Sequence, residues 1–383
     1  MKPDGRPLAI TVVRDRADLK AFIGMTRKLY ADDPAWIQPL TFERLQALDP
    51  RRNPALRHME MACWMVHRGP EIVGRISCQI NGEHLRQYHD DTAHFGFFEA
   101  IDDPEVIELL LDTAEIWARE RGMKRLQGPF TLSINEESGL LVDGFDTPPY
   151  LMMPHGKPYY RARLEELGYR KAKDLIAFHF DVTVPWPPAA RRLLERTARI
   201  TDLTVRPLDM KRFDEEIALI CDIFNDAWSK NWNFIPFDEE AIHHMGKAMR
   251  PIVSEKCFAI AELGGRPVAM AVTLPDINTA IRDLDGRLFP FGFAKLLWRL
   301  RVTGLRRWRM PLMGVRREIQ GTLKGAAAAL RVIDEIRSHH RSQGVEEGEL
   351  SWLLEDNRPV LDMVTTVGGR AYKTYRVFER DLV

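Results

Sequence analysis

The sequence predicts an α/β (α+β) protein of two tandem domains, each with a mixed, mostly antiparallel sheet flanked by helices. Its length of 383 residues exceeds that of one ordinary domain. Short strand-like and helix-like segments alternate along the whole chain. A proline-rich stretch interrupts this alternation near the middle, and the pattern then restarts. These three observations predict two domains of similar construction.

The boundary between the domains is marked by Val-Pro-Trp-Pro-Pro at residues 184–188. Proline-rich segments are stiff and extended, which suits a domain boundary. We therefore predict a first domain at residues 1–183, a linker at 184–202 and a second domain at 203–383. An internal repeat supports this division. Four residues near the end of the first domain recur 200 positions later: Gly168, Arg170, Lys173 and Phe178 recur as Gly368, Arg370, Lys373 and Phe378.

Hydrophobic periodicity places the elements within each half. In the first half we expect strands at residues 10–13, 61–67, 72–80, 93–99, 125–127 and 169–182, with helices at 17–30, 104–120 and 158–167. In the second half we expect strands at 203–205, 257–262, 267–274, 310–315, 349–354 and 372–378, with helices at 213–228, 239–249, 326–336 and 360–367. Pro104 suits the first turn of its helix, and Asp103 is placed to cap it.

The composition bounds the class of protein. Lys+Arg and Asp+Glu both number 55, so no net charge favours nucleic acid, and we expect no nucleic-acid partner. The four cysteines are scattered, which predicts buried free thiols in a reducing compartment and no metal site. No stretch approaches about 20 uninterrupted apolar residues, and residues 1–10 show no secretory pattern. We therefore expect a cytoplasmic protein.

The most informative stretch is Met310–Ala329. An apolar run at 310–315 suits a buried strand, a polar turn follows, and a strong helix former begins at Ala326. The free N–H groups and the dipole of a helix N-terminus favour an anion, glycines let a pyrophosphate approach the backbone, and Lys324 adds a mobile cation. The spacing matches neither G-x-x-x-x-G-K-[ST] nor G-x-G-x-x-G. An ordinary strand–turn–helix corner is the alternative.

This stretch resembles the coenzyme A pyrophosphate loop of the GNAT acyltransferase superfamily, Gln/Arg-x-x-Gly-x-Gly/Ala, with a turn one or two residues longer. The chain that follows also has the order of a GNAT domain: a strand, Asn357 at the start of a short helix, Gly368-Gly369 and a closing strand. At the level of element order the resemblance covers most of the chain. It implies that acyl-coenzyme A is bound by the following residues: Met313, Gly314, Val315, Gln320, Gly321, Thr322, Leu323, Lys324, Gly325, Ala326 and Asn357.

The resemblance also implies acyl transfer to an amine. The thioester carbonyl would lie against strand 310–315, where a backbone N–H polarises it, and a carboxylate would take the ammonium proton. Many members place the tyrosine that protonates the thiolate seven residues after the asparagine, where this chain has Val364. The candidate acid is therefore Tyr372, Tyr375 or water. The candidate bases are Glu349 and Asp276, with a salt-bridged glutamate and a loop-turn aspartate as the alternative interpretations.

The first domain differs at the equivalent place. Strand 93–99 runs directly into Ala100-Ile101-Asp102-Asp103-Pro104, with no glycine and no cation. Two carboxylates would face the position of a pyrophosphate, and like charges oppose anion binding. We therefore predict that the first domain is degenerate for coenzyme A.

The segment at 287–309 is an insertion without a carboxylate. On a helix from Phe293, the apolar residues Phe293, Leu296, Leu297 and Leu300 share one face, with Lys295 and Arg299 opposite. This pattern is typical of a helix in a membrane interface. The alternative is a helix packed on its own domain with its arginines in solvent. The pattern predicts peripheral binding to an anionic membrane surface, on the inner membrane, and an amphiphilic acceptor.

A tandem GNAT architecture with such a segment resembles the bacterial ceramide synthase type, which N-acylates a sphingoid base with a fatty acyl-coenzyme A. We therefore expect an acyl-coenzyme A-dependent N-acyltransferase for an amphiphilic amine, with no metal. Two alternatives remain. One is a small-molecule or aminoacyl-type N-acetyltransferase. The other is a non-catalytic acyl-coenzyme A-binding or membrane-docking protein, which Val364 in place of the expected tyrosine favours.

Overall fold

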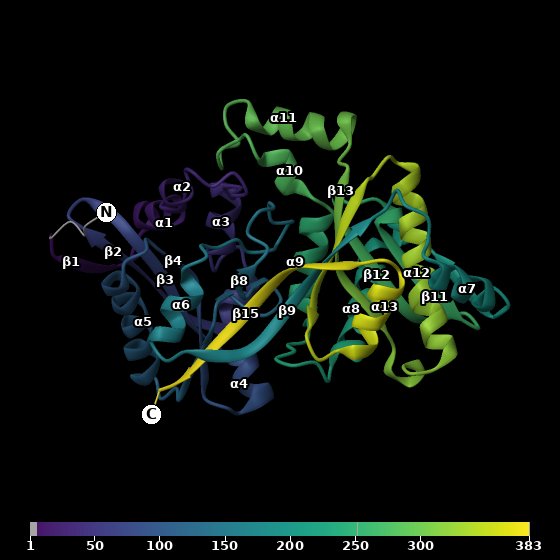
Figure 1. The fold of residues 1–383 in the computed structure, drawn as a ribbon, viewed down its shortest axis with the longest axis horizontal. Coiled ribbons are helices and arrows are strands. Elements are labelled where there is room, and N and C mark those ends of the chain that lie inside the picture. The colour runs from purple at the N-terminus through teal and green to yellow at the C-terminus, as the bar shows by residue number, and fades with distance from the viewer. Residues whose placement is uncertain (1–5, 251, 383) are drawn as a thin grey trace. The chain divides into compact units, whose positions relative to one another are not determined.

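The structure, a computed structural model, describes residues 6–250 and 252–382. Residues 1–5 of the predicted first domain, and residues 251 and 383 of the second, lie outside the described residues. Contacts within the chain divide it into two compact, discontinuous units (Figure 1). Unit 1 holds the described residues up to Leu175, Ile281–Lys295 and those from Lys373 onwards, and unit 2 holds Ile176–Ala280 and Leu296–Tyr372. The domain limits placed at the linker stay a prediction.

Unit 1 contains a sheet with the strand order β1-β2-β3-β4-β5-β15, in which β8 also pairs with β15. The β4–β5 pair is parallel, whereas the β1–β2, β2–β3, β3–β4 and β5–β15 pairs are antiparallel. The bounds are β1 (Leu8–Val12), β2 (Met59–Arg68), β3 (Glu71–Asn81), β4 (Thr92–Ala100), β5 (Arg125–Gly128), β8 (Leu140–Asp143) and β15 (Arg370–Asp381). A separate hairpin joins β6 (Phe130–Thr131) to β7 (Glu137–Ser138).

The main helix of unit 1 is α5 (Pro104–Arg119), which packs on β2, β3 and β4. As predicted, Pro104 occupies its first turn, and the Asp103 carboxylate accepts a hydrogen bond from the Glu105 N–H at 3.0 Å. The core between α5 and the sheet includes Ile76, Phe95 and Leu110, all fully buried. The remaining helices are α1 (Arg16–Gly24), α2 (Thr26–Leu29), α3 (Thr41–Ala47), α4 (Gly82–Tyr88) and α6 (Tyr160–Glu166).

Unit 2 contains a sheet with the strand order β9-β14-β13-β12-β11-β10. The β13–β14 pair is parallel, and β13–β12, β12–β11 and β11–β10 are antiparallel. The bounds are β9 (Arg170–Asp181), β10 (Leu203–Arg206), β11 (Phe258–Leu263), β12 (Arg266–Pro275), β13 (Arg307–Val315) and β14 (Glu347–Leu354). The fold class is therefore confirmed: a mixed, mostly antiparallel sheet is flanked by helices.

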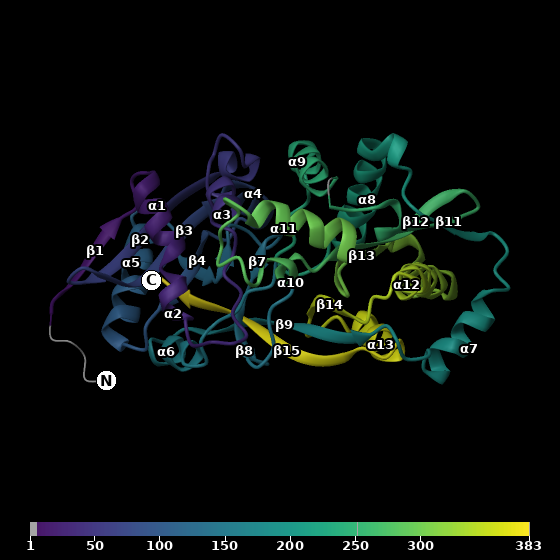
Figure 2. The ribbon, with the colours of Figure 1, turned by 90° about the horizontal axis from the view of Figure 1, so that it is seen from above.

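Two helices cover opposite faces of the unit 2 sheet (Figure 2). Successive strand residues point to opposite faces. Phe258 and Ile260 accordingly pack toward α8 (Phe213–Trp228), whereas Ala259 and Ala261 pack toward α12 (Leu323–Ser342). The small alanines on the second face let α12 approach the sheet closely. The other helices that lie wholly or partly in unit 2 are α7 (Pro188–Thr197), α9 (Glu239–Met249), α10 (Ile277–Ile281), α11 (Gly292–Trp298) and α13 (Arg358–Thr366).

Several elements differ from their predicted limits; the helix expected at 17–30, for example, is divided into α1 and α2. The predicted linker contains α7, which begins with Pro188 in its first turn and packs against α12. Proline is well placed there because its missing N–H would be unpaired in any case. The helix expected at 326–336 begins three residues earlier, at Leu323, because Thr322 caps it. The two glycines of the repeat, Gly168 and Gly368, both have positive φ (82° and 96°), and each lies two residues before the start of its strand, β9 or β15.

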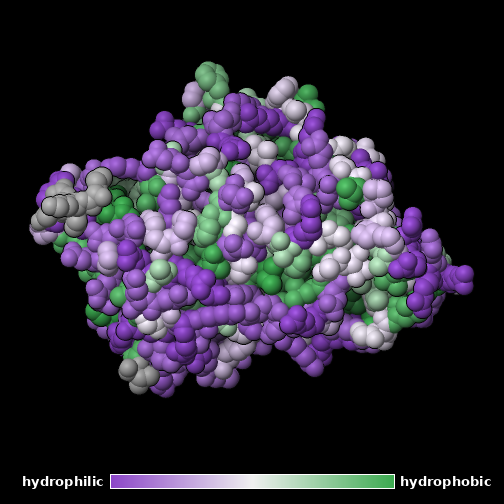
Figure 3. All heavy atoms as spheres, viewed as in Figure 1, coloured by the Kyte–Doolittle hydropathy of each residue, from purple (hydrophilic) through white to green (hydrophobic). Residues whose placement is uncertain are grey.

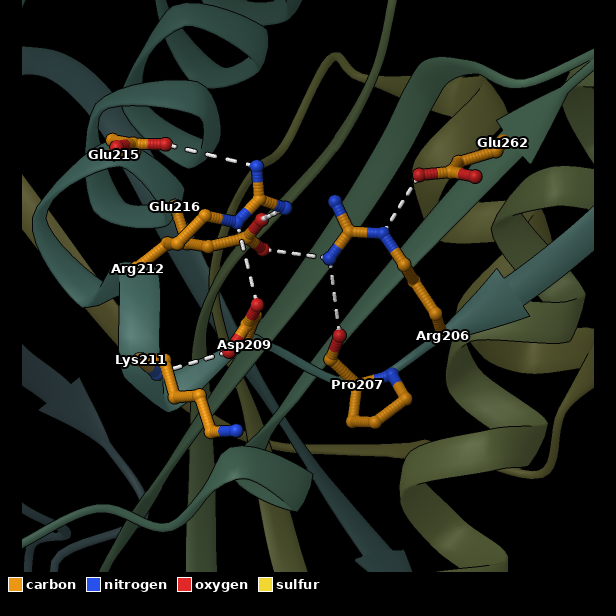
Figure 4. A network of polar contacts seen from close by, with 8 residues as sticks. All are labelled: Arg206, Pro207, Asp209, Lys211, Arg212, Glu215, Glu216 and Glu262. Carbon is orange, nitrogen blue, oxygen red and sulfur yellow. Dashed lines mark hydrogen bonds and ion pairs between the residues drawn. The ribbon is translucent and has the colours of Figure 1, made fainter.

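The N-terminal end of α8 is fixed by a network of ion pairs (Figure 4). Arg206, at the end of β10, donates to Glu216 of α8 and to Glu262 of β11, both at 2.7 Å. Glu216 is 3% exposed, so these hydrogen bonds and ion pairs must replace the water that its carboxylate would bind in solution. Arg212 approaches the same carboxylate at 3.5 Å from a more exposed position. The network holds α8 against the edge of the sheet.

We predict that Arg206→Met lowers the free energy of unfolding by about 2–4 kcal/mol, because it leaves the buried Glu216 carboxylate poorly compensated. Arg212→Met is the matched control. The Arg212 side chain is 58% exposed, so its loss should cost less than about 1 kcal/mol. Chemical unfolding curves of the two variants measure the difference, and equal losses would contradict this role for Arg206.

Candidate active site

The candidate site begins where the backbone pairing of β13 and β14 ends. The two strands pair in parallel only from Arg307 with Glu347 to Met310 with Leu350. Both strands then continue, β13 to Val315 and β14 to Leu354, outside the pairing that the structure describes. Peptide groups in a protein interior need hydrogen-bond partners. The separation therefore leaves backbone groups of β13 available to a ligand that enters between the strands.

A β-bulge in β13 accompanies this separation. On its other side, β13 pairs with β12 through Leu312 with Val272 and Arg309 with Leu274. Two residues, Met310 and Pro311, thus lie opposite Thr273 alone, and such a bulge bends the strand. Proline suits this place because it has no N–H to contribute to the ladder. As a result Met310 packs in the core beneath α12, whereas Leu312 packs in the core beneath α8.

The residue opposite the bulge is anchored to α12. The Thr273 hydroxyl donates to the Cys257 carbonyl at 2.9 Å, and its oxygen lies 2.9 Å from Nε2 of His340. Because the hydroxyl proton is used, a hydrogen bond from His340 requires the imidazole proton on Nε2. Burial lowers the pKa of His340 to about 4, so this ring is neutral at neutral pH. The bulge is therefore held by a neutral, buried contact.

Two predicted catalytic residues meet at the start of the separation. Glu349 of β14 is 0% exposed, and the Tyr372 hydroxyl donates to its carboxylate. The Ser351 hydroxyl donates to the other carboxylate oxygen at 2.5 Å, and Arg309 Nε donates to Ser351 Oγ at 2.9 Å. Arg309 Nε also lies 3.8 Å from the Glu349 carboxylate. The result is a buried carboxylate with two hydroxyl donors and a nearby cation.

The sequence prediction missed Arg309 and Ser351. A signal existed for Ser351, because residues two apart on a strand share a face and Glu349 was already a candidate. Arg309 carried no such signal. It closes the acid-free run 287–309, and its position opposite Glu349 follows from the parallel register of β13 and β14.

The other two predicted catalytic residues lie elsewhere. Tyr375 belongs to unit 1, is fully buried and pairs with Leu141 of β8. Asp276 is buried just after β12, where it accepts a hydrogen bond from Thr279 at 2.9 Å and lies 3.6 Å from Arg307 Nε. The structure thus brings Glu349 and Tyr372 together, and it places Asp276 in the turn position that was the alternative interpretation.

The predicted pyrophosphate loop forms a tight corner between β13 and α12. Gln320 Nε2 donates to the Val315 carbonyl at 2.8 Å, which holds the turn to the end of the strand. Gly321 has a φ of 73°, a conformation that favours glycine. A Cβ on Gly325 would lie 2.2 Å from the Ile319 carbonyl oxygen, so only glycine allows the helix to begin this close to the turn. The Thr322 hydroxyl accepts from the Gly325 N–H at 3.1 Å and caps the helix.

The charged residues around this corner are paired. Lys324 Nζ lies 2.9 Å from Asp202, and this hydrogen bond lowers the pKa of Asp202. Both side chains are about half exposed, so the pair is weak and can exchange for another anion. Arg316 and Arg317, which follow β13, pair with Asp222 and Asp226 of α8. The sequence prediction had named only Lys324 among these cations.

The remaining predicted binding residues border the same space. The Met313 carbonyl accepts a hydrogen bond from Trp228 Nε1 at 2.8 Å, and a Cβ on Gly314 would lie 3.0 Å from Ala227. Asn357 directly precedes α13, as predicted, without a capping hydrogen bond from its side chain. Val364, at the position where the resemblance expects a tyrosine, is buried in the core beneath α12. It therefore has a packing role.

Unit 1 also has a parallel strand pair that ends early, but the gap between its two strands, β4 and β5, is filled. Its β4 and β5 pair in parallel only from Thr92 to His94, and a bulge again follows in β4. Here, however, a Cβ on Gly96 would lie 1.9 Å from the Phe130 carbonyl oxygen, so the chain itself occupies the gap. The N-terminus of α5 holds the Asp103 carboxylate, which also pairs with Arg68 at 2.7 Å.

The insertion forms α11 and a π-helical turn at Arg299–Thr303 (η4). Figure 3 shows hydrophobic atoms at the top of the view, over α11. The large exposed apolar side chains of this segment are Phe289, Phe291, Phe293, Leu297, Trp298 and Val302. Within residues 6–250 and 252–382, no helix has both the length and the apolar character needed to cross a membrane.

The exposed face of α11 differs from the predicted one. Leu296 and Leu300 are half-buried, whereas Trp298 and Val302, which are not part of the predicted apolar face, are exposed. The reason is that the Arg299 guanidinium donates to the Ala280 carbonyl, which turns the Leu296 side of the helix inward. The exposed face is nevertheless apolar, with the exposed Arg301 beside it.

No model of a protein family matches the chain. The chain is 42% identical over 378 residues to the bacterial ceramide synthase of Caulobacter vibrioides, covering 98% of each chain. It is also 44% identical over 369 residues to protein YghO of Escherichia coli, covering 96% of this chain and 94% of that protein. The fold resembles a tandem GNAT protein from the clavulanic acid biosynthesis pathway, with a TM-score of 0.58, 12% identity and coverage of 98% and 99%. The chain belongs to the family of the bacterial ceramide synthase and protein YghO, and its fold is that of a tandem GNAT protein.

A second solved structure supports this fold. The GCN5-related N-acetyltransferase of Sphaerobacter thermophilus matches with a TM-score of 0.55 at 14% identity, over 98% of this chain and 97% of that one. The predicted family and the predicted class of enzyme, an acyltransferase, are both confirmed. In a tandem GNAT acyltransferase, the Glu349–Tyr372 pair supplies groups suited to acid–base chemistry, and the α12 N-terminus supplies groups suited to an anion.

Proposed function

We propose that this tandem GNAT acyltransferase transfers an acyl group from acyl-coenzyme A to the amino group of an amphiphilic amine. The amine we favour is a sphingoid base, in bacterial ceramide and sphingolipid synthesis. The observation that carries the proposal is the hydrogen-bonded Glu349–Tyr372 pair at the point where β13 leaves β14. The 42% identity to a bacterial ceramide synthase over 98% of both chains supports the choice of acceptor.

In this proposal unit 2 binds the acyl-coenzyme A. The N–H groups of the first turn of α12 and the helix dipole face the pyrophosphate, while the turn at Gln320–Thr322 leaves room for it. Lys324 can exchange its exposed partner Asp202 for a phosphate oxygen. The thioester carbonyl lies against β13 beyond the bulge, where a backbone N–H polarises it. Asn357, at the start of α13, borders the cofactor arm.

The chemistry uses the paired side chains in turn. The Glu349 carboxylate takes one proton from the substrate ammonium, and the neutral amine attacks the thioester carbon. The C–N bond forms and the C–S bond breaks. Tyr372 gives its proton to the departing thiolate and regains one from Glu349 through their hydrogen bond. This transfer restores both side chains, and the second ammonium proton leaves from the nitrogen to water. Arg309 and Ser351 hold the carboxylate in place.

We also propose that the exposed segment 289–302 binds an anionic membrane, so that the enzyme works as a peripheral protein on the cytoplasmic side of the inner membrane. A long-chain amine is scarcely present in free solution, so its acylating enzyme must take it from a bilayer. Aromatic and aliphatic side chains beside arginines suit the interface. A small-molecule or aminoacyl-type N-acetyltransferase, the alternative function, has no need of such a surface.

The binding of coenzyme A by unit 2 can be tested at Leu323, the first residue of α12, whose side chain is 54% exposed. Leu323→Glu should weaken coenzyme A binding at least tenfold, because it places a negative charge beside the pyrophosphate. The same charge interacts favourably with the helix dipole, so thermal stability should not fall. Leu323→Gln, equal in size and neutral, should bind nearly as well as the wild type.

Calorimetric titration gives both the affinity and the number of sites. One site per chain is expected, because the gap in unit 1 is filled by its own backbone. Two sites per chain, or equal affinity in the two Leu323 variants, would overturn the assignment.

The catalytic roles can be tested with conservative variants. Tyr372→Phe and Glu349→Gln should each lower kcat about 10²–10⁴-fold with little change in affinity for acyl-coenzyme A, because both act mainly in the transition state. Tyr375→Phe is the informative comparison, since Tyr375 is buried in unit 1. A large loss in Tyr375→Phe with full activity in Tyr372→Phe would transfer the acid role to Tyr375.

Membrane binding can be measured by sedimentation with phosphatidylglycerol vesicles. The triple variant Phe291→Ser, Phe293→Ser, Trp298→Ser should remain unbound, because each large apolar side chain contributes roughly 1.5–3 kcal/mol when fully buried. Its stability should be unchanged, since all three side chains are more than half exposed. The control variant Phe42→Ser, Ile116→Ser removes two similarly exposed apolar residues of unit 1 and should bind normally. If the wild type does not sediment at low salt, the membrane proposal fails.

A further inference from the structure

Two tryptophans connect β13 and β14 where their backbone pairing has ended. Trp228, the last residue of α8, donates from Nε1 to the Met313 carbonyl of β13 at 2.8 Å. Trp352 lies on β14, two residues beyond Leu350, the last residue paired with β13. The two ring centroids are 5.9 Å apart, with an interplanar angle of 64°. The space between the strands is therefore bordered by two indole rings.

These rings present apolar surface that the described residues do not fully cover. Trp228 and Trp352 are both half-buried, unlike Phe224 behind Trp228, which is 2% exposed. Phe237 and Leu312 are also half-buried, and Phe237 packs on Phe224 with ring centroids 5.1 Å apart. An aromatic surface of this kind gains free energy when an apolar ligand covers it.

The position of the surface indicates which part of the substrates would cover it. Trp352 directly follows Ser351, whose hydroxyl donates to Glu349. Trp228 is hydrogen-bonded to Met313, in the segment of β13 against which we propose that the thioester lies. The next atoms of an acyl-coenzyme A beyond its thioester carbonyl are those of the acyl chain. An acetyl group is too short to extend along two indole rings, whereas a long acyl chain can.

We infer that Trp228 and Trp352 form the wall along which the acyl chain of acyl-coenzyme A lies, and that this wall makes the enzyme prefer long-chain over short-chain acyl groups. The inference rests on the proposed function and deepens it by naming specificity-determining residues. Each methylene that the wall removes from water should improve binding roughly fourfold, so that a long chain is favoured over acetyl by several orders of magnitude.

The test compares binding and kcat/KM for acetyl-, octanoyl- and hexadecanoyl-coenzyme A with one amine acceptor. In the wild type both quantities should rise with chain length. Trp352→Ala should lower them at least tenfold for the hexadecanoyl ester and leave the acetyl ester unchanged, so that the ratio between the two collapses. Trp352→Leu keeps an apolar side chain and guards against misfolding. Its ratio of hexadecanoyl to acetyl use should lie between those of the wild type and Trp352→Ala.

Leu353→Ala is the matched control. It removes an apolar side chain from the next position of β14, but Leu353 packs toward the core beneath α12, so the ratio should stay at the wild-type value. Trp228→Phe keeps a ring and loses the hydrogen bond to Met313, and should give a partial loss.

Three results would overturn the inference: no chain-length preference in the wild type, an unchanged ratio in Trp352→Ala, or a gain in long-chain use, which would mean that the rings block the chain. Failure of the proposed function is distinguishable, because it appears as an absence of turnover with every ester. In that case the ratio of the affinities for hexadecanoyl- and acetyl-coenzyme A still tests the inference.

Discussion

The early end of the pairing between β13 and β14 is the constraint on which the site depends. After Met310 and Leu350, backbone groups of β13 face a space where a neighbouring strand would otherwise satisfy them. Several independent features maintain this geometry. The bulge at Met310–Pro311 bends β13, Trp228 of α8 holds its outer part at Met313, and Gln320 fixes its end to the following turn. The strand is thus held open at three points along its length.

The distribution of charge follows from the same geometry. Because β13 and β14 are parallel and in register at Arg309 and Glu349, a cation and a carboxylate are buried side by side at the last paired rungs. A buried carboxylate without partners would be costly, and here Ser351 and Tyr372 donate to it. At the far end of β13, the N-terminus of α12 favours a negatively charged ligand, because the helix dipole is positive there. The proposed base and the proposed anion site are therefore separated by the length of one open strand segment.

The two units share the same construction around their parallel strand pairs, and the differences between them show why the candidate site lies in unit 2. Both carry a parallel pair that ends early and a bulge in the same strand. In unit 1, Gly96 and Phe130 bring the backbone into the gap, and Asp103 places a carboxylate at the helix N-terminus. In unit 2, Thr322 caps the equivalent helix without a charge. The difference was visible in the sequence at Ala100–Pro104, but the filled gap was not, because it depends on a contact between residues far apart in the chain.

The sequence predicted the tandem fold and the turn after β13, since these depend on periodicity, glycine placement and element order. It named Glu349 and Tyr372 only among four candidate catalytic residues, and the structure shows that these two are hydrogen-bonded. It missed Arg309, Ser351 and the two tryptophans, whose roles depend on strand register and on the packing of α8. It also misplaced the exposed face of α11, because a short helix with apolar residues on several sides does not reveal which side its neighbours cover.

Hydrogen–deuterium exchange with and without a saturating long-chain acyl-coenzyme A tests the central claim most directly. If the open segment of β13 and the α12 N-terminus bind the substrate, amides of residues 312–326 become protected, while those of residues 95–106 in unit 1 keep their exchange rates. Protection of 95–106 without protection of 312–326 would contradict the account.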